Sequence, residues 1–149
     1  MNDPVIVCKG ITRCFRQGRS MIEVLRGVDL EIVRGEQVAI VGASGVGKST
    51  LLQILGGLDD PTAGSVEVAG HDMSRASERE RGRIRNRSLG FIYQFHHLLA
   101  EFSALENVAL PLMIGGQSSR KALAESAELL RRVGLGERLG HKPGELSGG

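Results

Sequence analysis

The feature that most constrains this chain is the nonapeptide at residues 42–50, Gly-Ala-Ser-Gly-Val-Gly-Lys-Ser-Thr. It satisfies the pattern G-x-x-x-x-G-K-[ST] at every fixed position, between an apolar run at 37–41 and a helix-compatible run at 48–55. A glycine-rich turn between a strand and a helix gathers backbone N–H groups at a helix N-terminus, and this arrangement binds phosphate. The sequence therefore predicts a buried strand at 37–41, a phosphate-binding loop and a helix at 48–55.

Different residues of this loop are expected to bind different parts of a triphosphate. Lys48 is expected to reach the β- and γ-phosphates, and Ser49 is expected to ligate Mg²⁺. Glycine lets the backbone approach phosphate oxygens without a clash at Cβ. The predicted nucleotide contacts here are Gly42, Ala43, Ser44, Gly45, Val46, Gly47, Lys48, Ser49 and Thr50.

Composition sets outer bounds on the kind of protein. The 149 residues are enough for one core, and 41% hydrophobic and 24% charged residues are ordinary values for a globular domain. No apolar run approaches the roughly 18 residues of a membrane span, and the N-terminus lacks a basic segment followed by an apolar one, so we expect a cytosolic protein. The spacing of Cys8 and Cys14 matches neither a redox pair nor a zinc knuckle, which predicts reduced thiols.

Runs of β-forming residues surround the loop. Residues 5–15 and 28–32 before it, and 65–68 after it, are predicted to be strands joined by turns. Phe15 lies at the end of the first strand, where an aromatic ring either stacks on a purine or lies at the rim of the core. Periodicity does not distinguish these two interpretations.

A second apolar run leads to another candidate residue. Residues 89–93 predict an inner strand, which places Gln94 at its end, where ligand-contacting residues of open α/β sheets gather. Ser103 and Glu106 form a capping box that opens a helix running to about residue 114, with Pro111 expected to bend or end it. A further amphipathic helix is predicted at 120–133.

Two charged or apolar clusters admit alternative interpretations. Four arginines recur at i, i+4 within a helix-compatible segment at 74–87, namely Arg75, Arg79, Arg83 and Arg87. These arginines form either a solvated face or a surface that binds anions. Because no aromatic residues interleave with them and the net charge is only +2, we favour the solvated face and expect no nucleic-acid partner.

Large apolar residues also follow Gln94, and they either fold inward or line a groove for an amphipathic helix of another chain: Phe95, Leu98, Leu99 and Phe102.

Three separated motifs together resemble the ATP-binding-cassette ATPases: the phosphate loop, Gln94 after an apolar run, and Leu-Ser-Gly-Gly at 146–149. The resemblance covers essentially the whole chain. It implies an α/β fold with a phosphate-loop NTPase core, an antiparallel β subdomain at the N-terminus and a helical subdomain, divided at about 1–94 and 95–149. Residues 91–99 and 103–108 look most like the ATPase subunits of bacterial lipoprotein-releasing transporters, with macrolide-export and cell-division cassettes as the nearest alternatives.

The resemblance also implies roles for individual residues. Phe15 would stack on adenine, Lys48 would act in catalysis, and Gln94 would attend Mg²⁺ and the attacking water. Residues Ser147, Gly148 and Gly149 would contact the nucleotide of a second ATPase subunit in a head-to-tail dimer. The other partners would be integral membrane subunits, with this chain bound peripherally at the cytoplasmic face of the inner membrane.

The sequence departs from the family pattern at its end. Because it stops inside the Leu-Ser-Gly-Gly motif, the later strand with the magnesium-binding aspartate, the catalytic glutamate and the switch histidine have no positions in it. We therefore expect the chain as given to bind ATP without sustaining hydrolysis. A nucleotide-binding module without turnover is the alternative to a transport ATPase.

Overall fold

The computed structural model describes residues 3–94 and 97–147. The chain divides into two compact units, Met1–Leu89 and Gly90–Gly149. Each unit is described by itself below.

The first unit is built on a four-stranded antiparallel sheet with the order β2-β1-β3-β4. β1 (Pro4–Gln17) and β2 (Ser20–Val33) form a long hairpin, and β3 (Ala63–Val68) pairs with the other edge of β1 and with the short β4 (His71–Asp72). The predicted strands at 5–15, 28–32 and 65–68 are confirmed, and the hairpin strands extend beyond the predicted runs. Several register shifts interrupt the β1–β2 ladder, and such bulges increase the local twist.

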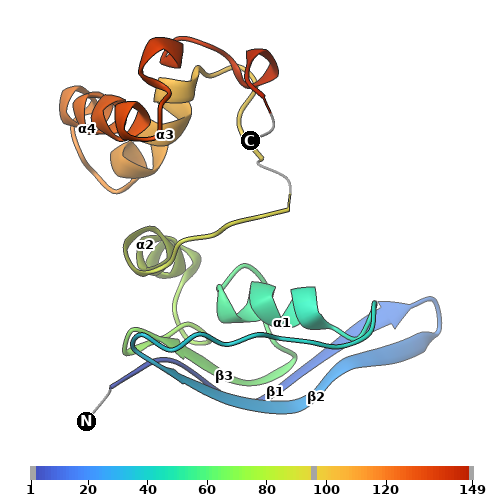
Figure 1. Cartoon of the computed structure of the whole chain (residues 1–149). Coiled ribbons are helices and arrows are strands. Elements are labelled where there is room, and N and C mark those ends of the chain that lie inside the picture. Colours follow the sequence, from blue (N-terminus) through green and yellow to red (C-terminus); the bar gives the residue numbers. More distant parts are fainter. Residues whose placement is uncertain (1–2, 95–96, 148–149) are drawn as a thin grey trace. The chain divides into compact units, whose positions relative to one another are not determined.

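Helix α1 (Lys48–Leu55) lies against one face of this sheet, as Figure 1 shows. The strands contribute the residues that face α1, and the helix contributes the side chains on the side that faces the sheet. The buried core consists of Cys8, Ile11, Leu25, Leu51, Ile54, Leu55, Val66, Val68 and Met73. Burying an aliphatic side chain of this size stabilises a protein by about 1.5–3 kcal/mol. This packing holds in place the helix that begins at the phosphate loop.

The thiols of Cys8 and Cys14 are free, as predicted. Cys8 is buried in the core, and this burial raises the pKa of its thiol. A raised pKa keeps the side chain neutral at physiological pH, which suits a small core residue.

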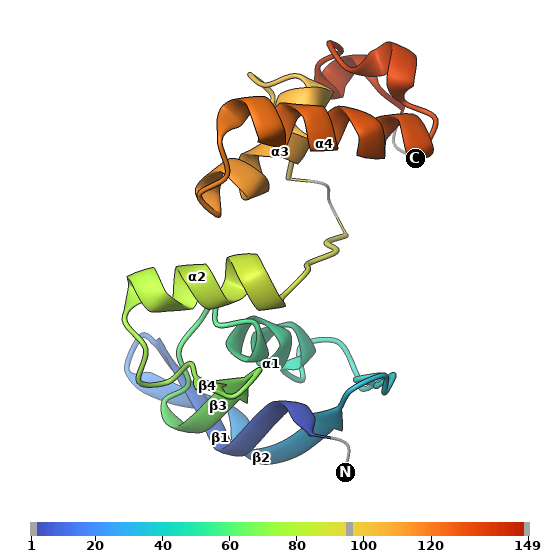
Figure 2. The ribbon, with the colours of Figure 1, turned by 90° about the vertical axis from the view of Figure 1, so that its left-hand side faces the viewer.

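Helix α2 (Glu78–Ser88) lies on the same side of the sheet as α1 (Figures 1 and 2). The predicted helical segment started at 74, but the helix begins later because Ser77 accepts a hydrogen bond from the Glu80 amide and caps it. No residue of α2 is buried. Ile84 packs against the core while remaining partly exposed, and charged contacts attach the helix further: Arg81 forms an ion pair with Asp60, and Arg85 donates a hydrogen bond to the carbonyl of Gly57.

The second unit contains a pair of packed helices, α3 (Ala104–Ile114) and α4 (Ser119–Arg132), followed by the short 3₁₀ turns η1 (Gly136–Arg138) and η2 (Pro143–Glu145). The predicted capping box is confirmed: the Ser103 hydroxyl accepts from the Glu106 amide, and the Ser103 amide donates to the Glu106 carboxylate at 2.8 Å. Pro111 lies inside α3, so it does not end the helix. Small residues fill the helix interface, including Ala109 and Ala122.

Two predicted strands are wrong. Residues 37–41 and 89–93 adopt no regular secondary structure and pair with no strand among the described residues. An apolar, β-prone run becomes a strand only where a neighbouring strand completes its backbone hydrogen bonds, and this sheet is completed by β1 to β4 instead. Each run is exposed in part, with Val41 at 85% and Ile92 at 102% of full accessibility, whereas Ile40 and Leu89 are partly buried against the core.

Within residues 3–94 and 97–147, none of the helices combines the length and the apolar character needed to cross a membrane.

Candidate functional site

The phosphate loop ends in a glycine that starts helix α1. Gly47 is the N-cap residue with a φ of 100°, in the left-handed region, and its carbonyl accepts the first helical hydrogen bond from the Leu51 amide at 2.8 Å. Gly42 and Gly45 also have positive φ values, 155° and 81°. The first amides of a helix have no intrahelical acceptor, so those of Lys48, Ser49 and Thr50 remain available to an anion.

The Lys48 side chain folds back over the loop. Its Nζ donates to the carbonyl of Gly42 at 2.9 Å and to the carbonyl of Ala43 at 2.6 Å. These bonds hold the positive charge at the mouth of the loop, and no carboxylate of residues 3–94 or 97–147 forms an ion pair with it. If a phosphate oxygen were bound there, the Lys48 ammonium could donate to this charged acceptor in place of the two neutral carbonyls. A hydrogen bond between two charged groups is stronger than one to a neutral acceptor.

Close packing against β2 explains why Gly47 must be glycine. A Cβ on Gly47 would lie 2.7 Å from Cγ1 of Val24 and 3.0 Å from Cδ2 of Leu25. The loop thus lies directly on the hairpin, and its backbone path is set by contact as well as by conformation. The motif predicted a glycine at this position but not the strand that it contacts.

Phe15, the candidate for base stacking, lies near the end of β1 and is 40% exposed. The guanidinium of Arg13 lies over its ring, with 4.7 Å from Cζ to the ring centroid. Arg13 Nη2 also donates to Asp59 Oδ1 at 2.8 Å. Neither Arg13 nor Asp59 was predicted to belong to the site, since their contact joins residues 46 positions apart.

The remaining predicted site residues lie in the second unit. Gln94 is exposed, in the irregular segment before α3, and Ser147 is exposed after η2. Gly148 and Gly149 lie outside the described residues, as does Phe95. The chain leading to Ser147 is tied to α3, because the amides of Ala104 and Leu105 donate to carbonyls of the 139–141 segment at 2.8 and 3.0 Å.

The apolar segment after Gln94 is held by one side chain that the sequence analysis missed. Asn107 Nδ2 donates to the carbonyls of Leu99, Phe102 and Ser103, at 3.1, 3.1 and 3.0 Å, and its Oδ1 accepts from the Leu99 amide at 2.9 Å. The side chains of Leu98, Leu99 and Phe102 remain exposed, at 42%, 41% and 38%. Residues 97–102 therefore form a turn that is tied by hydrogen bonds and presents apolar side chains.

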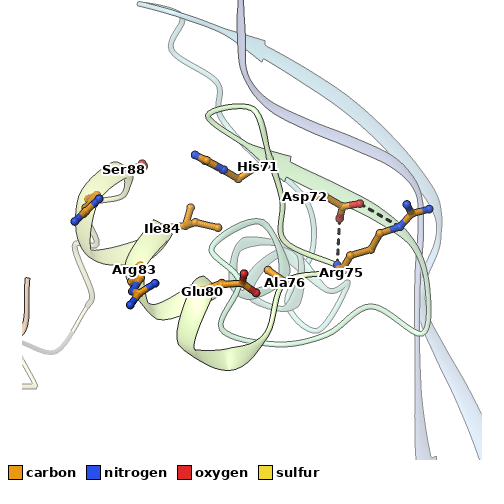
Figure 3. A pocket seen from close by; sticks show the side chains of 9 residues that line it. His71, Asp72, Arg75, Ala76, Glu80, Arg83, Ile84 and Ser88 are labelled. Atoms are coloured by element: carbon orange, nitrogen blue, oxygen red, sulfur yellow. Dashed lines mark hydrogen bonds and ion pairs between the residues drawn. The ribbon is translucent and has the colours of Figure 1, made fainter.

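A pocket of about 500 Å³ lies between the β4 region and α2, and Figure 3 shows the side chains that line it. Three arginines of the stripe contribute to its lining, namely Arg75, Arg83 and Arg87. Arg75 extends away from Arg83 toward Asp72, with which it forms an ion pair at 3.5 Å. The four arginines therefore do not converge on one point, which favours the solvated-face interpretation of the stripe.

The oxygen donors of the loop suit Mg²⁺ better than a softer metal. Ser49 offers a hydroxyl oxygen at the first turn of α1, and Gln94 offers an amide oxygen in the second unit. In the part of the chain that the structure describes, no group of three or more His, Cys, Asp or Glu residues could hold a metal ion. A magnesium ion bound through few protein ligands and substrate phosphates is consistent with this donor set.

Comparison with known proteins gives consistent results. Residues 25–149 match the sequence profile of the family described as ABC transporter. The chain is 57% identical over 146 residues to the lipoprotein-releasing system ATP-binding protein LolD of Alcanivorax borkumensis, and 56% identical over 149 residues to that of Xylella fastidiosa. These alignments cover 98% and 100% of this chain but 64% and 62% of the relatives, so the chain spans less than two thirds of their length.

Solved structures give the same fold. An ATP-binding cassette in a dimeric post-hydrolysis state bound to ADP and Pi is 36% identical, with a TM-score of 0.85. The match covers 96% of this chain and 63% of that one. A second dimeric structure, of a bacterial ABC transporter cassette, is 38% identical with a TM-score of 0.84, and it covers the same shares. The predicted α/β fold class is confirmed.

Proposed function

This chain belongs to the ABC transporter family, and from that premise we propose that it is the ATP-binding part of a transport ATPase that drives the release of lipoproteins from the inner membrane toward the outer membrane. The observation that carries the nucleotide-binding part is the phosphate loop, with its positive-φ glycines and with Lys48 held at its mouth by two backbone carbonyls. The names of the LolD relatives support the lipoprotein part.

The loop binds the triphosphate through backbone and side chain together. The free amides at the start of α1 donate to phosphate oxygens, and the helix dipole adds partial positive charge at the same point. Lys48 leaves the carbonyls of Gly42 and Ala43 and reaches the β- and γ-phosphates. Phe15 supplies a ring on which the base stacks. Ser49 would hold Mg²⁺, with Gln94 proposed as a further ligand from the family resemblance, and the ion would supply positive charge to the β- and γ-phosphates.

A single substitution tests the nucleotide site. Lys48→Ala removes the charge but leaves the loop, whose path is set by glycines and by packing on β2. We expect ATP affinity to fall at least tenfold by isothermal titration calorimetry, as charge-assisted bonds are each worth about 1.5–3 kcal/mol. Lys9→Ala, on an exposed position of β1, is the matched control. Equal ATP affinity in both variants would reject the site.

The second ATPase subunit is expected to contact Ser147 and the glycines after it. The dimeric state of the two similar cassettes supports this arrangement. In the full-length protein, Ser147→Arg should abolish ATP-dependent dimerisation, measured by light scattering, and spare ATP binding by the monomer. Loss of ATP binding by the monomer would contradict a contact made only with the partner's nucleotide.

Integral membrane subunits are expected to contact the exposed turn that Asn107 holds. Leu98, Leu99 and Phe102 present an apolar surface of the kind that accepts an amphipathic helix, which would place the chain peripherally at the cytoplasmic face of the membrane. Leu99→Asp in the full-length protein should leave basal ATP hydrolysis nearly intact and abolish co-purification with the membrane subunits. If this variant assembled and released lipoproteins normally, the contact with the membrane subunits would have to lie at another surface.

A further inference from the structure

We propose that Arg13 is a positioning residue for base binding, which holds the Phe15 ring in the orientation that receives a purine. This inference rests on the proposed nucleotide-binding function, and it adds the means by which the base platform is aligned with the phosphate loop. All of the residues on which the inference rests belong to the first unit.

Arg13 covers one face of the Phe15 ring. The two residues are separated by one position along β1, and the guanidinium carbon of Arg13 lies 4.7 Å from the ring centroid of Phe15. A cation over the face of an aromatic ring is attracted by the negative charge density of that face. Phe15 is nevertheless 40% exposed, so part of the ring surface remains open to a ligand.

Asp59 holds Arg13 in that position. The contact from Nη2 to Oδ1 measures 2.8 Å, and both side chains are largely shielded, at 22% and 29% exposure. The same carboxylate oxygen accepts from the Asp60 amide at 2.8 Å, which fixes Asp59 within its own turn. Arg13 Nε is buried without a hydrogen-bond partner among the described residues, a cost that the ion pair and the ring contact must outweigh.

The turn that carries Asp59 is attached to both α1 and β1. The Leu58 amide donates to the carbonyl of Gln53 near the end of α1 at 2.8 Å. The Thr62 amide donates to the carbonyl of Thr12 at 2.8 Å, and the Thr62 hydroxyl accepts from the Cys14 amide at 3.0 Å. Contacts thus run without interruption from the Phe15 ring to the helix that begins at the phosphate loop.

A ligand that carries both a base and phosphates gains from this alignment, because the Phe15 ring and the phosphate loop are already held in fixed positions relative to each other. Immobilising a side chain before binding removes an ordering cost that the ligand would otherwise meet. Inorganic tripolyphosphate has no base and gains nothing from Phe15. The ratio of ATP affinity to tripolyphosphate affinity therefore isolates the contribution of Arg13.

The test measures both affinities by calorimetry for the full-length protein and its variants, in the presence of Mg²⁺. Arg13→Met keeps the apolar stem and loses the guanidinium, and we expect ATP affinity to fall about 3- to 10-fold with tripolyphosphate affinity unchanged. Asp59→Asn keeps the side-chain shape and should cause a smaller loss in the same direction. Arg16→Met, at an exposed position of the same strand, should change neither affinity.

A double substitution separates positioning from general structure. If Arg13 acts through Phe15, then Arg13→Met should add little to the ATP loss already caused by Phe15→Ala. Additive losses, or an equal loss of tripolyphosphate affinity in Arg13→Met and Asp59→Asn, would overturn the proposal. Other results would contradict the proposed nucleotide-binding function itself. These are a failure of the unmodified protein to bind either ligand, or unchanged affinity for both ligands in Lys48→Ala.

Discussion

The two units of this chain bury their cores in opposite ways. In the first unit, branched side chains from the sheet and from α1 fill the core, and Ile11, Ile54 and Val66 are each at most 1% exposed. In the second unit, α3 and α4 are in contact and their buried residues are mostly small: Ala109 and Ala122 are both 0% exposed, and Leu130, at 4%, is the large exception among the described residues. The first core depends on filled volume and the second on close approach of two helices. Deletion of atoms should therefore damage the first, and addition of atoms the second.

Their exposed segments differ in a corresponding way. The phosphate loop takes its path from backbone conformation, with Gly45 and Gly47 at φ values of 81° and 100°. The apolar turn after Gln94 takes its path from one side chain, Asn107, which makes hydrogen bonds to three carbonyls and one amide. A loop made of backbone amides can surround an anion, whereas this turn presents exposed apolar side chains on its surface.

The largest expected effect tests the contrast between the cores. Ile54→Ala should lower the free energy of unfolding by about 2–5 kcal/mol, because it leaves a cavity beneath α1. Ala122→Leu should lower that of the second unit by about 1–3 kcal/mol through overpacking. Amide hydrogen exchange assigns each loss to its unit. A larger loss from Ala122→Gly than from Ala122→Leu would show that close helix approach does not set the second core.

A smaller effect is expected in the phosphate loop. Gly47→Ala places a Cβ against Val24 and forces a residue with a side chain into positive φ, which costs about 1–3 kcal/mol. ATP affinity should fall by a similar free energy in a calorimetric titration. Gly45→Ala is the control, because it has positive φ but nothing within 4 Å of the new Cβ. Equal losses in the two variants would mean that contact with β2 contributes nothing.

The turn of the second unit should respond to loss of its central side chain. Asn107→Ala removes the hydrogen bonds to the Leu99 and Phe102 carbonyls, and we expect a local destabilisation of about 1–2 kcal/mol. The amides of residues 97–102 should then exchange faster, with the first unit unaffected. Asn107→Asp keeps the acceptor for the Leu99 amide and should give an intermediate rate. Unchanged exchange in both variants would show that other contacts order the turn.

The smallest effect concerns pH. Hydrogen bonds from the Ser103 amide and hydroxyl lower the pKa of Glu106. A lowered pKa in the folded state means that the carboxylate stabilises α3 above the unfolded pKa of about 4.3, and that this contribution is lost as pH falls through the folded value. Glu106→Gln should therefore reduce the loss of helical circular dichroism between neutral and acidic pH. Glu101→Gln, at an exposed position, should leave that loss unchanged.

The elements that sequence patterns predicted well are those specified by neighbouring residues. The capping box at Ser103 and Glu106, the helix at 48–55 and the alternating strands all depend on contacts within a few positions. The runs at 37–41 and 89–93 were predicted by the same kind of pattern and are not strands. Their apolar character was recognised correctly, but pairing depends on a partner that local pattern does not specify.

The sequence by itself determined the phosphate loop, because glycine, lysine and serine at fixed offsets produce its conformation and charge locally. Only the tertiary structure decided what surrounds that loop. It placed Val24 against Gly47 and Asp59 against Arg13. These contacts depend on how distant segments pack, and packing is set by the whole chain at once, so no short pattern encodes it.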